Sequence, residues 1–208
     1  MKLGRKLPHT SRVLALSHFY SCKNKAMHYC ESVLETDALM TLEFDPHVTT
    51  YTTQPFSINY AIEGRKRRYT PDILAKYGDN SFKSIEVKPL AKFQQPKNIK
   101  KFTVLRAFFQ RELDHPLILL SCADIYQGAQ IDNLKRLYPY CQQRTLNKAQ
   151  QHAYHQLPEQ LTLVSLITTL KNDTYSAYHA AMQLVANRYL SWDVTTPLLD
   201  TTMLTKVY

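Results

Sequence analysis

One stretch of this chain, residues 69–88, constrains the fold more than any other. Its second half, Phe82–Lys88, alternates apolar and polar residues, which is the period of a β-strand with one buried face. A second short apolar run begins at Asp72, and residues 77–80 between the two runs are typical turn formers. The pattern therefore predicts a β-hairpin.

This hairpin would bring together a small set of charged side chains. Because successive side chains of a strand point to opposite faces, Glu86 and Lys88 share one face, and Asp72 lies beside them if the runs pair. Hard divalent ions such as Mg²⁺ take oxygen ligands, activate water and neutralise charge that develops on a phosphate. A lysine at the same place stabilises that charge. The three residues therefore predict a site that cuts phosphodiesters, although Glu-x-Lys also occurs in many solvated strands.

A third carboxylate is expected from a helix over residues 29–44. The apolar arc of this helix consists of Leu34, Ala38, Leu39 and Leu42. Glu31 and Glu35 fall inside the arc, and a buried carboxylate is costly unless it is paired or binds a metal ion. We expect Glu35 to face the hairpin and to supply a third oxygen ligand. The alternative is that the helix is rotated and one glutamate lies at its rim.

The charge of the chain favours an anionic partner. Its net charge is +9. Residues 1–146 hold 22 Lys/Arg and 13 Asp/Glu, whereas residues 147–208 hold four of each. The positive charge thus belongs to the part that carries the acidic residues, and carboxylates converging on a basic face favour a nuclease over a general binder of RNA or acidic lipid.

Composition excludes several other classes of protein. The four cysteines form no Cys-x-x-Cys pair, so structural zinc is not expected. Only four glycines are present, which argues against a glycine-rich phosphate loop. No apolar run approaches the roughly 20 residues of a membrane-spanning helix.

Three basic segments are candidates for contacts with a nucleic-acid backbone. The first 30 residues contain six Lys/Arg and no acid, so residues 1–28 are expected to form a basic arm or a poorly ordered terminus. A turn before Asp72 carries Arg65, Lys66, Arg67 and Arg68. A helix is expected to extend to Arg111, and four lysines lead into it: Lys92, Lys97, Lys100 and Lys101. Each segment fits either phosphate contacts or an ordinary solvated surface.

The remaining pattern predicts an α/β protein with two domains. Strands are expected at residues 48–53, 56–62 and 116–120, giving a mixed sheet flanked by helices over residues 29–146. Residues 142–160, rich in Gln and His, are expected to form a linker in which His152 and His155 lie on the surface. Helices at residues 161–170 and 175–190, followed by two short strands, favour a small winged-helix-like domain over residues 147–208.

Several separate motifs resemble one known family, TnsA, the endonuclease subunit of heteromeric transposases. The resemblance covers residues 21–101 in consistent order. The motifs that carry it are Glu31-Ser32-Val33-Leu34-Glu35, Leu42-Glu43-Phe44-Asp45-Pro46-His47-Val48, Gln54-Pro55, Tyr69-Thr70-Pro71-Asp72 and Glu86-Val87-Lys88-Pro89. Beyond this region the chain is similar to the family in size and layout only.

The resemblance implies a restriction-endonuclease-like (PD-(D/E)xK) fold and Mg²⁺-dependent DNA hydrolysis, with Mn²⁺ expected to substitute. Glu35, Asp72 and Glu86 match the metal-binding acids, and Lys88 matches the catalytic lysine. In the family this subunit nicks the 5′ strands at transposon ends. A DDE-type transposase, TnsB, cuts and joins the 3′ ends, and an AAA+ regulator, TnsC, couples both to target selection.

The resemblance also implies a bacterial cytoplasmic, nucleoid-associated protein without a membrane partner. The short chain resembles members found in CRISPR-associated, RNA-guided transposons. Two alternatives stay open at this point. The chain could be a stand-alone restriction or resolvase-type nuclease, or a non-catalytic DNA-binding assembly subunit.

Overall fold

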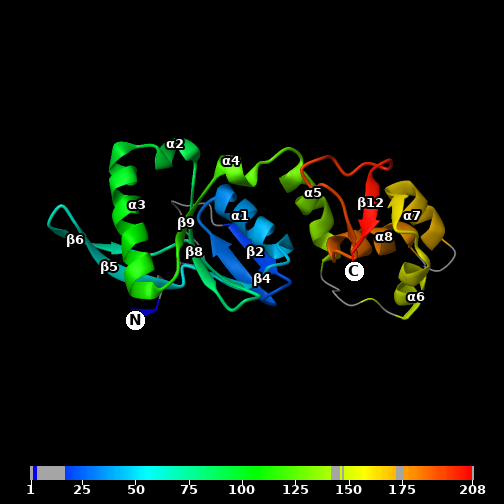
Figure 1. The fold of residues 1–208 in the computed structure, drawn as a ribbon, viewed down its shortest axis with the longest axis horizontal. Helices are drawn as coiled ribbons and strands as arrows, with labels where there is room; N and C mark the ends of the chain where they lie inside the picture. The colour runs from blue at the N-terminus through cyan, green and yellow to red at the C-terminus, as the bar shows by residue number, and fades with distance from the viewer. Residues whose placement is uncertain (1, 4–16, 142–145, 147, 172–175, 208) are drawn as a thin grey trace. The chain divides into compact units, whose positions relative to one another are not determined.

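The structure is a computed structural model that describes residues 2–3, 17–141, 146, 148–171 and 176–207 (Figure 1). The chain forms two compact units, Met1–Ile125 and Tyr126–Tyr208. The division lies before the boundary at residues 146 and 147 that the charge distribution suggested. Of the expected basic arm, Arg5, Lys6 and Arg12 lie outside the described residues.

The first unit combines strands and helices in alternation. Its elements are β1 (Lys2–Leu3), β2 (Ser17–Ser21), β3 (Ala26–Cys30), α1 (Val33–Phe44), β4 (Val48–Thr53), β5 (Phe56–Ile62), β6 (Arg65–Tyr69), β7 (Ile73–Tyr77), β8 (Phe82–Lys88), α2 (Leu90–Phe93), α3 (Pro96–Phe108), the π-helical turn η1 (Phe109–Leu113), β9 (Leu117–Ser121) and α4 (Cys122–Ile125).

The central sheet is mixed and has the strand order β4-β7-β8-β9. β7 and β8 form the expected antiparallel hairpin, in which Ile73 lies opposite Ile85. β9 pairs with β8 in parallel after the crossover through α2 and α3. β4 lies at the edge of the sheet, and α1 packs on β8. The predicted mixed sheet flanked by helices is therefore confirmed.

The basic run Arg65–Arg68 is a strand, where the sequence suggested a turn. The turn consists of Glu63 and Gly64 alone, with φ of 50° and 71°. Two residues with positive φ form the tight connection whose twist matches that of paired strands. β6 therefore begins at once and pairs with β5 along its whole length, so that the four basic side chains alternate between its faces.

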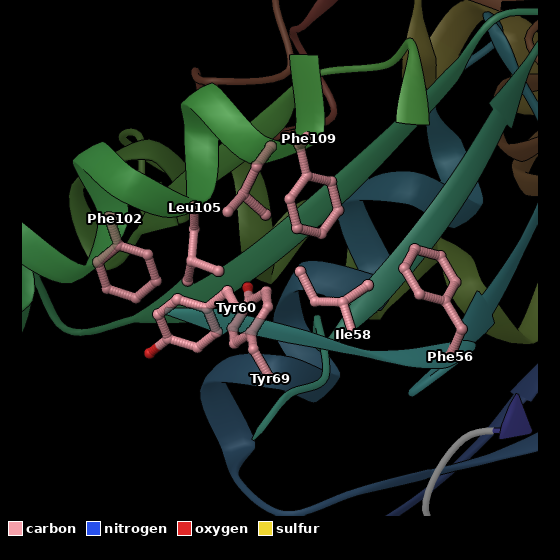
Figure 2. Close-up of a cluster of buried hydrophobic side chains, with 8 residues drawn as sticks. Phe56, Ile58, Tyr60, Tyr69, Phe102, Leu105 and Phe109 are labelled. Atoms are coloured by element: carbon pink, nitrogen blue, oxygen red, sulfur yellow. The ribbon is translucent and has the colours of Figure 1, made fainter. Parts of the chain in front are cut away.

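Helix α3 packs on β5 through an aromatic core. Figure 2 shows Phe102, Leu105 and Phe109 pointing from the helix and the turn after it toward Tyr60 and Tyr69 of the strands. Phe109 is fully buried, and its ring packs edge-on against Tyr69 at a centroid separation of 6.0 Å. This cluster fixes α3 against the strand pair that leads into Asp72.

Helix α1 begins at Val33, four residues later than the sequence pattern suggested. Ser32 is the N-cap and accepts a hydrogen bond from the Glu35 amide at 3.2 Å. The preceding residues Tyr29 and Cys30 belong to β3. The helix ends at Phe44, before Pro46, as predicted.

Residues 17–28 also differ from the expected arm, because they form most of the β2–β3 hairpin. Lys23 in its turn donates hydrogen bonds to the carbonyls of Leu42 at 2.8 Å and Val48 at 2.7 Å. Lysine commonly satisfies the last carbonyls of a helix in this way. Lys23 therefore supports the C-terminal end of α1.

The second unit is mainly helical. Its elements are α5 (Gln130–Leu137), the 3₁₀ turn η2 (Tyr138–Tyr140), α6 (Lys148–Gln156), β10 (Gln160–Thr162), α7 (Leu163–Leu170), α8 (Ala177–Ala186), β11 (Leu190–Ser191) and β12 (Met203–Lys206). The strands form an antiparallel sheet of order β10-β12-β11. Residues 148–156 are thus a helix, where a linker was expected, and His152 and His155 are exposed as predicted.

The sequence predicted two helices and two short strands here, whereas the described part of the second unit contains the four helices α5 to α8 and three short strands. The winged-helix assignment stays a prediction. Within the described residues, no helix combines the length and the apolar character needed to cross a membrane.

Candidate active site

The β7–β8 hairpin places Asp72 beside the end of β8. Asp72 directly precedes β7, and its Oδ2 atom accepts a hydrogen bond of 2.7 Å from the amide of Val87. Glu86, the neighbour of Val87, is only 2% exposed. The predicted juxtaposition of Asp72 with Glu86 and Lys88 is therefore present.

Both oxygens of Glu86 have partners within the protein. Its Oε1 atom accepts a hydrogen bond from Lys88 Nζ, and its Oε2 atom accepts one of 2.6 Å from the Tyr69 hydroxyl. Burial alone would lower the pKa of Lys88, but the carboxylates of Glu86 and Asp72 outweigh it and raise that pKa. Lys88 is therefore held as a cation at the end of the sheet.

The two acids crowd each other. Burial, followed by the charge of Glu86, raises the pKa of Asp72 to about 7, although Lys88 and the Val87 amide act in the opposite direction. The Oδ1 atom of Asp72 accepts no hydrogen bond from the described residues. A cation that approached this oxygen would relieve the repulsion between the carboxylates.

Glu35 lies close enough for its charge to act on Asp72 and Lys88. Its carboxylate also closes a capping box at the start of α1: Oε1 accepts from the Ser32 hydroxyl at 3.0 Å and Oε2 from the Glu31 amide at 2.9 Å. Burial raises the pKa of Glu35, and these hydrogen bonds oppose the shift. Its role as a third ligand stays a prediction.

Gln54, from the Gln-Pro motif, lies between the two acid-bearing segments. Its backbone N–H donates to the backbone carbonyl of Asp72 at 2.8 Å, and its side-chain Nε2 atom donates to Glu31 Oε1 at 3.3 Å. Its backbone has a φ of 45°, which is uncommon for a residue other than glycine. Its Oε1 atom is buried and has no partner among the described residues. Such an orphan acceptor in a native fold calls for a donor or a cation.

The chemistry of these groups is that of ligands for a hard divalent cation. The carboxylate of Glu86, the Oδ1 atom of Asp72 and the Oε1 atom of Gln54 all offer oxygen, the ligand type that Mg²⁺ prefers, and the last two accept no hydrogen bond from the described residues. Lys88 adds a cation that could stabilise charge on a phosphate.

Two residues that sequence reasoning did not assign to the site join it through long-range contacts. Tyr69 donates to Glu86 from β6, and Lys101 Nζ from α3 lies 4.8 Å from the Tyr69 ring centroid. The sequence predicted Lys101 only as one of several lysines that contact the DNA backbone. The Tyr69-Thr70-Pro71-Asp72 segment placed Tyr69 near the acids, but no local pattern indicates the partner of its hydroxyl.

A basic groove of about 920 Å³ lies between the β5–β6 strands and α3. Its cationic lining residues are Lys66, Arg67, Arg68 and Arg111, and its lining contains no acid. Tyr60 also lines the groove, and its ring packs edge-on against Tyr69 at 6.5 Å. The groove is thus connected to Glu86 through two aromatic rings.

The other residues that the sequence predicted to contact DNA lie outside this groove, on β6 and on the helices α2 and α3. Arg65 is exposed on β6 but does not line the groove. Lys92, Lys97 and Lys100 are exposed on α2 and α3, and Lys100 pairs with Glu63 at 3.1 Å.

Comparison with known proteins agrees with this geometry. Residues 45–114 match the family described as TnsA-like endonuclease N terminal. The match includes Asp72, Glu86 and Lys88 and begins after Glu35. No curated protein shows a significant match to the chain. The segment that forms the acidic hairpin, the basic strand β6 and the helix α3 is therefore similar to the N-terminal domain of TnsA-like endonucleases.

Proposed function

We propose that this protein is the metal-dependent endonuclease subunit of a transposase and that it hydrolyses the 5′ strand at transposon ends. The observation that carries the proposal is the convergence of Asp72, Glu86 and Lys88 at one end of the β7–β8 hairpin, inside a TnsA-like endonuclease domain. In this proposal the domain has the restriction-endonuclease-like fold, and the second unit is winged-helix-like.

Each residue of the site has a distinct task in this mechanism. Asp72 and Glu86, with Glu35 as the third acid, would hold Mg²⁺, and the ion would supply an activated water and stabilise charge on the phosphate. Tyr69 fixes the orientation of Glu86 through its 2.6 Å hydrogen bond. Lys88 stabilises the negative charge that develops on the phosphate as the bond breaks.

The basic groove and the exposed lysines would hold the DNA backbone. Lys66, Arg67 and Arg68 line the groove, and Arg65, Lys92, Lys97 and Lys100 extend the positive surface around it. Contacts of this kind give affinity without sequence readout, so binding should weaken steeply with salt. Recognition of the end sequence would then fall to a DDE-type partner of the TnsB kind, with a TnsC-like regulator.

Strand-specific mapping of cleaved ends tests the proposal. Wild type, Asp72→Ala and Asp79→Ala are each incubated with a TnsB-like transposase, the regulator, Mg²⁺ and a plasmid that carries transposon ends. Asp79 is a matched control, because it lies exposed in the turn of the same hairpin, where its carboxylate accepts a hydrogen bond of 2.9 Å from the Ser81 amide.

Wild type and Asp79→Ala should free both strands, whereas Asp72→Ala should leave only 3′-strand breaks. Cleavage by wild type without the transposase would favour a stand-alone nuclease. Identical products from all three proteins would contradict the proposal and favour a non-catalytic assembly subunit.

A further inference from the structure

Lys101 differs from every other lysine of α3 in its surroundings. It lies one helical turn before the fully buried Leu105 and therefore on the core-facing side of the helix. Its ammonium lies 4.8 Å from the ring centroids of both Tyr69 and Phe102. Both distances are within the range of a cation–π contact. Lys97 and Lys100, by contrast, are exposed.

The ammonium of Lys101 also lacks an acceptor. Lys88 donates to Glu86, and Lys100 donates to Glu63. Within the described ranges, no oxygen accepts a hydrogen bond from Lys101 Nζ. A partly buried cation without an acceptor is costly, and burial lowers the pKa of Lys101 accordingly. An anion bound at this position would satisfy its three N–H donors.

The position of Lys101 indicates which anion it would bind. The ring that holds its ammonium belongs to Tyr69, whose hydroxyl donates to Glu86. The charges of Glu86, Asp72 and Lys88 all act on Lys101. An anion that reached Lys101 would therefore lie next to the acids that are proposed to hold the cation.

We propose that Lys101 is a second cation of the active site and that it contacts the phosphate group held at Asp72 and Glu86. This inference rests on the proposed function. It separates Lys101 from the lysines that would hold the DNA backbone elsewhere, and it gives Tyr69 two tasks, since the hydroxyl orients Glu86 while the ring supports Lys101.

The first test measures phosphate binding without cleavage. Calorimetry with thymidine 3′,5′-bisphosphate and Ca²⁺ compares wild type, Lys101→Met and Lys83→Met. Lys83 is a matched control because its ammonium also lies over a tyrosine ring, 4.0 Å from the centroid of Tyr77, but at the other end of the β7–β8 hairpin. We expect Lys101→Met to weaken binding by about ten- to a hundredfold, and Lys83→Met by less than about twofold.

Thermal melting of the same variants excludes a folding defect. Because the Lys101 ammonium has no acceptor, Lys101→Met should melt at or above the temperature of wild type. Lower stability together with unchanged bisphosphate binding would show that Lys101 is structural and would overturn the inference. Equal binding by Lys101→Met and Lys83→Met, or no binding by wild type, would overturn it as well.

The second test measures 5′-strand nicking in the complete transposase reaction under single turnover at saturating DNA. Lys101→Met should lower the rate by roughly a hundredfold, and Lys101→Arg should recover part of it. If wild type binds the bisphosphate through Lys101 but never nicks the 5′ strand, the proposed function fails and the Lys101 contact stands. If wild type nicks and Lys101→Met nicks equally fast, the Lys101 inference fails and the function stands.

Discussion

The candidate site in the first unit and the buried residue Asn133 in the second unit have opposite surroundings. Asn133 donates to the carbonyls of Val194 and Thr196 and accepts from the Leu198 amide, at 2.7–3.0 Å. In the candidate site, the carboxylates of Asp72 and Glu86 repel each other, and the Oδ1 atom of Asp72 accepts no hydrogen bond from the described residues. Neutral groups with a full set of partners stabilise a fold, whereas crowded charges indicate binding or catalysis.

The same contrast holds between the buried amides. Gln150 and Gln183 in the second unit bond to each other at 2.7 Å. Gln54 in the first unit keeps a buried Oε1 atom without a partner in the described part of the chain. We infer that substitutions of the site residues in the first unit affect activity more than stability and that substitution of Asn133 in the second unit does the reverse.

The largest expected effect is on catalysis. Lys88→Met removes the cation that Glu86 holds at the end of β8 and should slow 5′-strand nicking by on the order of 10²–10³-fold. Lys83→Met is the control, because Lys83 lies at the other end of the same strand over the ring of Tyr77. Single-turnover nicking assays check both variants. If both variants lose the same fraction of the nicking rate, Lys88 has no role that distinguishes it from Lys83 elsewhere in the sheet.

The next effect is on stability. Asn133→Ala removes the hydrogen bonds to the Val194 and Thr196 carbonyls and to the Leu198 amide, of which the Thr196 carbonyl keeps a second donor in Trp192 Nε1. The substitution should lower the free energy of unfolding by about 2–4 kcal/mol. His152→Ala, on the exposed face of α6, should change it by less than about 0.5 kcal/mol. Denaturant unfolding measures both. If Asn133→Ala leaves the free energy of unfolding unchanged, the inference that Asn133 stabilises the second unit is wrong.

A smaller effect sharpens the role of Tyr69. Tyr69→Phe removes the hydroxyl that orients Glu86 and should slow nicking by about tenfold while lowering stability by about 1 kcal/mol. Tyr60→Phe is the matched control, because Tyr60 lies in the same aromatic cluster and its hydroxyl has no hydrogen-bond partner in the described residues. If both variants nick at the rate of wild type, the hydroxyl of Tyr69 has only a packing role.

Local patterns predicted the parts of the fold that local physics decides. The strands β4, β5 and β8 have the predicted bounds, and β5 shows the expected alternation of buried and more exposed side chains. The single buried face predicted for β8 was wrong, because the central strand is buried on both faces from Ser84 to Val87. The start of α1 was placed too early, since the Ser32–Glu35 capping box was not considered. Residues 148–156 were taken as a linker because Gln and His form no clear apolar stripe, yet they form α6.

Contacts between distant segments decided the rest. The basic residues of β6 would repel one another in isolation, and pairing with β5 holds them in a strand. The acids of the site could be named from their spacing, because one hairpin carries both. Tyr69 and Lys101 could not be assigned to the site from the sequence. Tyr69 contacts Glu86 from another strand, and Lys101 contacts Tyr69 from helix α3.

Thermal melting of wild type and Asp72→Asn, with and without Ca²⁺, tests the central claim most directly. The claim is that the crowded carboxylates exist to hold a cation. Asparagine keeps an acceptor for the Val87 amide but removes one charge from the pair. Without Ca²⁺, Asp72→Asn should be at least as stable as wild type, and only wild type should gain stability when Ca²⁺ binds. A destabilised Asp72→Asn that responds to Ca²⁺ as wild type does would contradict the account.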